Sequence, residues 1–188
     1  DANWQMMAML NILVPICGAC MMYHTEYTNN GAQKMDVLPV RTGKLFVMKF
    51  IIAALVFVLM VAIETAVLAG CAVHWFPGYE IDMLELLKSV GFQWFVALPT
   101  VMLMLVIASA CKNMWISLGI GVILVFTLSI FPQDNLVLNL FPFSSPYQSF
   151  SAAAENNRIP LFISICAAET VVLGLLEPVY QKVRRCTE

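Results

Sequence analysis

The chain has 188 residues, of which 61% are hydrophobic and only 12% are charged. Soluble domains carry about 25% charged residues, so this composition excludes an ordinary water-soluble fold. The formal net charge of −2 and the lack of a long basic patch give no indication of a nucleic-acid-binding protein. Runs of about 20 apolar residues instead predict helices that cross a lipid bilayer.

The apolar runs predict an all-α membrane protein, a polytopic helical bundle in which five spans are visible. The expected spans are residues 4–23, 50–72, 92–111, 114–132 and 160–180. All 188 residues then form one transmembrane domain.

The first span, residues 4–23, has one polar residue near its middle, Asn11. Cys17 and Cys20 form a C-x-x-C pair, a spacing that occurs in metal and redox sites. Because there is no second pair and the neighbours are apolar, small packing residues are the favoured interpretation. We therefore expect this chain to hold no metal and no cofactor.

Residues 24–49 form the longest polar segment, with four basic residues against Glu26 and Asp36. Thr25 is a plausible helix cap, and Pro39 stops a helix at about Leu38. Between them a weakly apolar face recurs at helical spacing: Tyr27, Gly31, Met35 and Leu38. We expect a short helix, parallel to the membrane, that docks a soluble protein. A solvated, positively charged loop is the alternative.

In residues 80–91 the apolar residues Ile81, Leu84, Leu87 and Val90 recur every three positions on one side and charged residues occupy the other. This pattern predicts a short amphipathic helix lying in the outer membrane interface. Lys112 and Asn113 leave a very short turn between the third and fourth spans, so these two helices should form an antiparallel hairpin. Gly119 and Gly121 in the fourth span indicate helix packing or a flexible point.

Residues 133–159 combine prolines and aromatic residues in a polar stretch. We expect an extracellular loop with short interfacial helices, and a re-entrant dip is an alternative. Glu177 lies near the predicted cytoplasmic end of the last span, where we expect water to reach it.

The positive charges set the expected orientation. Eight of the ten basic residues fall on one side of the predicted spans and only Lys88 and Arg158 on the other. The 24–49 loop, the Lys112 turn and the C-terminus should therefore be cytoplasmic. Five spans that start outside imply a missing upstream span, so we expect six in the intact protein, located in a bacterial cytoplasmic membrane.

Two carboxylates, Glu64 and Glu169, fall inside predicted spans. Ionisable residues at this depth are costly and usually functional. We expect them to be protonated, to bond hydroxyls such as those of Thr65, Ser109 or Thr170, or to face a polar cavity. With Asn11 they are candidates for a substrate pathway for an amphipathic cargo, and inter-helix hydrogen bonding is the alternative.

No ATP-binding loop is present, because Gly43-Lys44 is followed by Leu45, and no catalytic set converges. The polar loop nevertheless resembles the corresponding segment of permease subunits of type-2 ABC exporters, closest to lantibiotic immunity and multidrug-type permeases. The resemblance rests on Glu26, Gly31, Lys34, Leu38-Pro39-Val40, Lys44 and Lys49 running into a hydrophobic span. Arg41-Thr42 replaces the family's Ser-Arg order, and the FPFSSP segment before the last span is also similar.

The resemblance implies that a separate cytoplasmic subunit hydrolyses ATP with Mg²⁺, so the chain itself is not an enzyme. It also implies that two permease chains, identical or related, form the export pathway. The coupling helix would contact the ATPase through Glu26, Tyr27, Gly31, Lys34, Met35, Leu38, Pro39 and Arg41.

Two other functions remain open from the sequence. A self-sufficient proton-coupled transporter or channel would use Glu64 and Glu169 as proton sites. A non-transporting membrane scaffold or sensor would show no substrate-linked phenotype.

Overall fold

The computed structural model describes residues 2–28, 42–75, 82–111, 113–130 and 141–187. Helices dominate these ranges and no strand occurs within them, which confirms the predicted all-α class. Four helices are long and apolar enough to cross a bilayer, and another apolar helix is shorter. The described part of the chain is thus a polytopic helical bundle.

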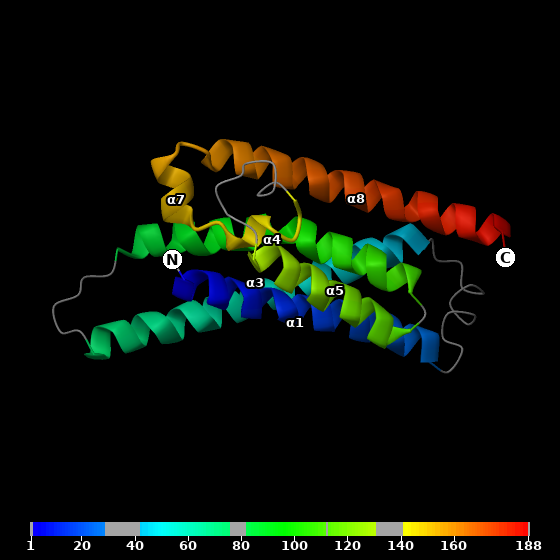
Figure 1. Ribbon diagram of the computed structural model, residues 1–188, viewed down its shortest axis with the longest axis horizontal. Helices are drawn as coiled ribbons and strands as arrows, with labels where there is room; N and C mark the ends of the chain where they lie inside the picture. The colour runs from blue at the N-terminus through cyan, green and yellow to red at the C-terminus, as the bar shows by residue number, and fades with distance from the viewer. Residues whose placement is uncertain (1, 29–41, 76–81, 112, 131–140, 188) are drawn as a thin grey trace.

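The long helices lie along the long axis of the molecule (Figure 1). Their bounds are Ala2–Tyr27 for α1, Thr42–Trp75 for α3, Met83–Ala110 for α4, Met114–Ile130 for α5 and Ile159–Thr187 for α8. Two short helices precede α8, namely η2 (Ser145–Tyr147) and α7 (Phe150–Glu155). We call the end where α1 and α4 finish and α3 and α5 begin the basic end, since most basic residues flank it in the sequence. The opposite end is the far end.

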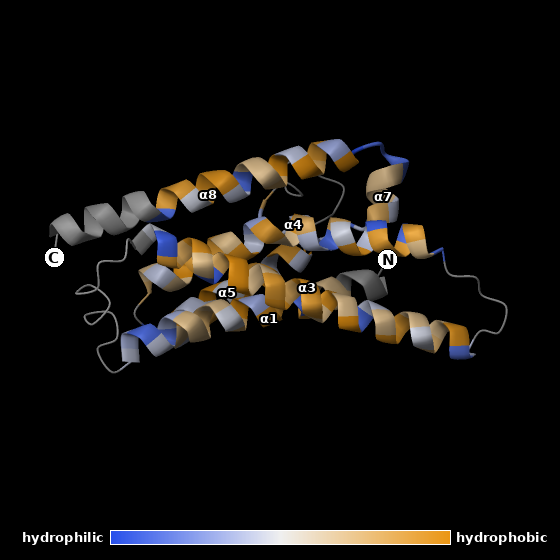
Figure 2. Ribbon diagram, turned by 180° about the vertical axis from the view of Figure 1, so that it is seen from behind, coloured by the Kyte–Doolittle hydropathy of each residue, from blue (hydrophilic) through white to orange (hydrophobic). Residues whose placement is uncertain are grey.

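Helix α4 is the centre of the bundle, because it packs against α1, α3, α5 and α8. Helices α3 and α8 lie at the periphery and expose large apolar side chains such as Leu59 and Leu175. Figure 2 shows this hydrophobic surface along the middle of the helices, with more hydrophilic residues near several helix ends. Such a surface is suited to contact lipid tails.

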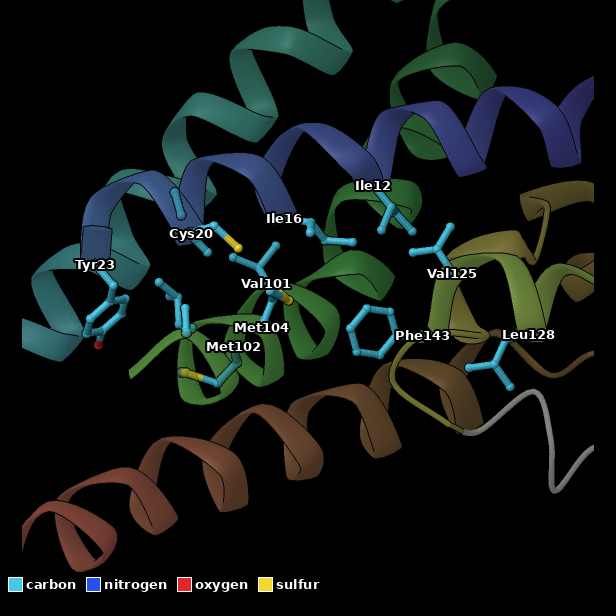
Figure 3. Packing of buried hydrophobic residues seen from close by; sticks show 14 of the residues in the cluster. Ile12, Ile16, Cys20, Tyr23, Val101, Met102, Met104, Val125, Leu128 and Phe143 are labelled. Atoms are coloured by element: carbon cyan, nitrogen blue, oxygen red, sulfur yellow. The ribbon is translucent and has the colours of Figure 1, made fainter. Parts of the chain in front are cut away.

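The main core joins α1, α4 and α5 (Figure 3). A Cβ atom at Gly121 would lie 2.8 Å from Cγ2 of Ile16 and 2.9 Å from the sulfur of Met104, whereas Gly119 has open space. Gly121 therefore lets α5 approach α1 and α4 closely, as small residues do between membrane helices. This confirms the helix-packing interpretation for Gly121.

The polar segment between the first two spans is shorter than the predicted 24–49. Helix α1 continues to Tyr27, where the rings of Tyr23 and Tyr27 stack 6.3 Å apart on one face. The hydroxyl of Thr25 donates to the carbonyl of Met22 inside α1, so Thr25 does not cap a following helix. Helix α3 already begins at Thr42.

Residues 80–91 do not form a separate interfacial helix within the described range. From Met83 onward they are the first turns of α4, and Asp82 caps this helix by accepting from the backbone N–H of Leu84 and Glu85. Gly91 lies within this continuous helix, and a Cβ atom there would meet open space. One long helix replaces the predicted amphipathic helix and third span.

Residues 141–147 lie against α4 and α5 within the bundle. Phe143 is fully buried in the main core, and Ser145 Oγ donates to the carbonyl of Val96 at 3.1 Å. Thr100 donates its hydroxyl to the carbonyl of Pro142. Tyr147 donates to the carbonyl of Val125 on α5 at 3.0 Å, and burial raises the pKa of this phenol to about 12. Hydrogen bonds to α4 and α5 thus hold this segment against the bundle, and its position relative to the membrane stays a prediction.

Candidate functional site

An ion pair joins α1 to α3 at the basic end. Lys49 on α3 pairs with the carboxylate of Glu26 on the last turn of α1. Its ammonium also lies 3.6 Å from the centre of the Tyr23 ring, a cation–π contact. Both charged side chains are mostly buried. In a membrane helix such charges are stabilised by pairing with one another, which fixes the ends of α1 and α3 together.

The same cluster reaches α4 and α8. The phenol of Tyr27 donates to the carbonyl of Ser109 on α4 at 2.7 Å. Glu177 on α8 interacts electrostatically with Lys49 and Tyr23. Glu177 is only 2% exposed, so the expectation that water reaches it was wrong. We call Tyr23, Glu26, Tyr27, Lys49, Ser109 and Glu177 the basic-end cluster.

The predicted ATPase-docking residues divide into two groups. Glu26 and Tyr27 lie in the last turn of α1 and take part in the basic-end cluster. The other six, Gly31, Lys34, Met35, Leu38, Pro39 and Arg41, lie outside the described residues, as does the predicted coupling helix. Docking therefore stays a prediction. The structure adds that the helices on either side of segment 29–41, α1 and α3, are joined by the ion pair between Glu26 and Lys49.

The predicted pathway candidates Asn11 and Glu64 meet between α1 and α3. The Asn11 amide nitrogen donates to Oε2 of Glu64 at 2.6 Å. Both residues line a cavity between α1, α3 and α4, nearer the far end than the basic-end cluster. Gln93 and Ser89 of α4 line the same cavity. The structure thus brings together residues from three helices: Asn11 and Glu64 are 53 positions apart in the sequence, and Gln93 lies on α4.

Glu169 does not line this cavity. It lies on α8, and its Oε2 atom is buried without a hydrogen-bond partner in the described part of the chain. The hydroxyls proposed as partners act elsewhere: Thr65 donates to the carbonyl of Val61 and Thr170 to that of Cys166, each on its own helix. Glu64 and Glu169 are therefore separate features.

Two contributors were missed from the sequence. Gln93 lies in an apolar run beside Trp94, and nothing in that local pattern indicates which neighbour it faces. Lys49 was assigned to the loop, although its position eight residues before Phe57, in an uninterrupted helical run, could have placed it inside α3. In the first span, Cys20 is buried and receives a hydrogen bond from Ser117 at 3.3 Å, in keeping with a packing role.

Comparison with known proteins identifies the chain's family. Residues 2–128 match the family described as ABC-2 family transporter protein, which covers α1, α3, α4 and most of α5. No curated protein and no solved structure matches the chain. The match extends over more than half of the 188 residues. The chain therefore belongs to the ABC-2 transporter family, as a multi-pass permease subunit of an ABC transporter.

Proposed function

We propose that this permease exports an amphipathic substrate with energy from ATP hydrolysed by a separate cytoplasmic subunit. The family membership supports the ATP-driven mechanism. The observation that carries the proposal is the basic-end cluster, which ties the two flanks of segment 29–41 to each other and to α4 and α8. A partner that pushes on this segment would move four helices together.

In this proposal the basic end faces the cytoplasm, in agreement with the distribution of positive charges. The partner subunit binds ATP and Mg²⁺ and docks on segment 29–41, which places the C-terminus on the same side. A second permease chain, identical or related, completes the pathway against the apolar surface that α3 and α8 expose. A lantibiotic peptide or an amphipathic drug is a suitable cargo.

The test is affinity capture of the protein from native membranes in mild detergent, followed by identification of the soluble proteins that co-purify. We expect an ATPase with a nucleotide-binding loop to accompany the wild type and to be lost with Gly31→Arg. Glu26→Ala should weaken its association, because the ion pair that holds the loop flank is removed. Lys88→Ala, an exposed change at the far end, is the matched control and should retain the ATPase.

One observation favours a proton-coupled carrier as the second candidate. Glu64 is an intramembrane carboxylate at a polar-lined cavity, an arrangement suited to proton binding. Vesicles that contain the purified protein alone distinguish the two functions. Transport driven by a pH gradient without ATP or a partner would support the carrier and contradict the ATP-driven exporter.

A further inference from the structure

The cavity between α1, α3 and α4 has a volume of about 160 Å³. Five of its lining residues are polar: Asn11, Glu64, Thr65, Ser89 and Gln93. The two hydroxyls are already engaged, since Thr65 donates to the carbonyl of Val61 at 2.7 Å and Ser89 to that of Glu85 at 2.9 Å. The carboxylate of Glu64 and the side-chain amides of Asn11 and Gln93 are therefore the polar groups that can bind a ligand in the cavity.

Three acceptor oxygens of this cavity lack a partner among the described residues. Asn11 occupies Oε2 of Glu64, which leaves Oε1, the side-chain carbonyl of Asn11 and the side-chain carbonyl of Gln93. Asn11 and Gln93 are only 5% and 8% exposed. None of these three oxygens is both fully buried and without a partner, so they open into the cavity and can accept hydrogen bonds from an occupant.

We propose that this cavity binds a primary ammonium group carried on a short aliphatic stem, as the recognition group of the exported substrate. This inference rests on the proposed function for its purpose and names the substrate class. The positive charge of the ligand follows from Glu64, because no basic residue in the described part of the chain lines the cavity. An ammonium group offers three N–H donors and no acceptor, which matches three open acceptor oxygens.

The geometry disfavours other cations. A guanidinium group binds a carboxylate best through both oxygens, and Asn11 already occupies one of them. A quaternary ammonium has no N–H, so it could not donate a hydrogen bond to the side-chain oxygens of Asn11 and Gln93. A primary ammonium matches the charge of Glu64 and can donate to the open oxygens of the cavity.

The short aliphatic stem of the proposed ligand is inferred from the apolar residues that line the cavity and from the cavity volume. The other lining residues are apolar: Met7, Leu68, Ala69, Leu86 and Val90. A volume of about 160 Å³ leaves room for the ammonium group and a short alkyl stem. Leu68 is 49% exposed at the rim, where a longer apolar chain would continue toward lipid.

The test uses the purified protein in phosphatidylcholine nanodiscs and n-pentylammonium as the probe. Dicyclohexylcarbodiimide labels intramembrane carboxyl groups, and mass spectrometry reports the labelling rates of Glu64 and Glu169 in one sample. We expect saturating n-pentylammonium to slow labelling of Glu64 at least tenfold and to leave Glu169 unchanged. Neutral 1-pentanol and pentyltrimethylammonium at the same concentration should protect Glu64 less than twofold.

Each of the following results would overturn the proposal. If 1-pentanol protects Glu64 as well as n-pentylammonium does, the cavity binds apolar groups without recognising the ammonium. If pentyltrimethylammonium or sodium chloride protects it equally, the cavity recognises positive charge but not N–H donors. Full protection by phosphatidylethanolamine in the nanodisc would assign the site to a lipid headgroup rather than to an alkylammonium. A Glu64 rate that no probe changes would show that the cavity takes no amine.

Thermal unfolding provides a second readout that does not depend on labelling. n-Pentylammonium should raise the Tm of the wild type and of Glu169→Gln, but not of Glu64→Gln, which keeps the Asn11 contact and removes the charge. An equal shift, or none, in all three proteins contradicts the proposal. Neither experiment needs ATP or a partner, so failure here is distinguishable from failure of ATPase capture.

Discussion

Lys49 is the residue on which the basic-end cluster depends. It pairs with Glu26, lies over the Tyr23 ring and interacts electrostatically with Glu177. Lys49→Met keeps the length of the side chain and removes its charge, so buried carboxylates lose their counter-charge. We expect this change to lower the free energy of unfolding by about 3–5 kcal/mol, measured by denaturation in detergent.

Lys44→Met is the matched control for Lys49→Met, since Lys44 lies on the same helix and is exposed. Surface charges contribute little, so its effect should be within about 0.5 kcal/mol. The double variant Glu26→Gln with Lys49→Met should recover part of the loss, because it leaves one buried carboxylate fewer without a partner. Equal effects of the two lysine changes would contradict the cluster.

Tyr147 makes a prediction about pH. Its folded-state pKa of about 12 lies above the ordinary value of 10, because burial disfavours the phenolate. The contribution of the protonated Tyr147 phenol to the free energy of unfolding is complete below pH 10. It is lost as pH rises from 10 toward 12, because in this range the phenol ionises in the unfolded state but stays protonated in the folded state. Tyr147→Phe should therefore cost about 1 kcal/mol at pH 7, through the lost bond to Val125, and less at pH 11.

The measurement is the difference in unfolding free energy between wild type and Tyr147→Phe at pH 7, 9 and 11, which cancels the other tyrosines. A difference that stays constant across this range would contradict burial of an intact phenol.

At the residue scale, the sequence predicted Asn11 and Glu64 as candidates separately but not as a pair. Each is conspicuous because it is polar within an apolar run. Their contact depends on how α1 and α3 are rotated toward each other, which local patterns do not determine. Gln93 was missed for the same reason, since its importance comes from the helices that face it.

The packing of α5 depends on one small residue. Gly121→Val should place methyl groups against Ile16 and Met104, and we expect a loss of about 1–3 kcal/mol from overpacking. Gly119→Val is the control, because it changes helix propensity equally but meets open space. Denaturation of both variants checks the expectation. If Gly119→Val is as destabilising as Gly121→Val, close packing is not the reason for the glycine.

Element existence could be predicted from the sequence, whereas element ends could not. Apolar runs located the five long helices, because a bilayer requires about 20 apolar residues in each span. The polar first turns of α4, from Met83 to Gly91, were separated from the span because hydropathy changes there. Helical hydrogen bonding continues through such a change in polarity, as it does through Thr42–Lys49 at the start of α3.

At the scale of the whole molecule, the basic-end cluster and the cavity are connected by the same helices. Helices α1, α3 and α4 contribute to both, so a displacement at the basic end would be transmitted to the walls of the cavity. This arrangement supports a mechanism in which docking on segment 29–41 controls access to the substrate. The sequence predicted the flanks of that segment, but their link to Ser109 and Glu177 required tertiary structure.

The most direct test of the account is site-specific photo-crosslinking in native membranes from two positions of the same protein. A photoreactive residue replaces Lys34, in segment 29–41, or Leu84, which is exposed at the far end. The account predicts a crosslinked adduct that contains an ATP-binding subunit from position 34 and none from position 84. An adduct from position 84 alone, or no ATPase adduct from either position, would contradict ATP-driven coupling at the basic end.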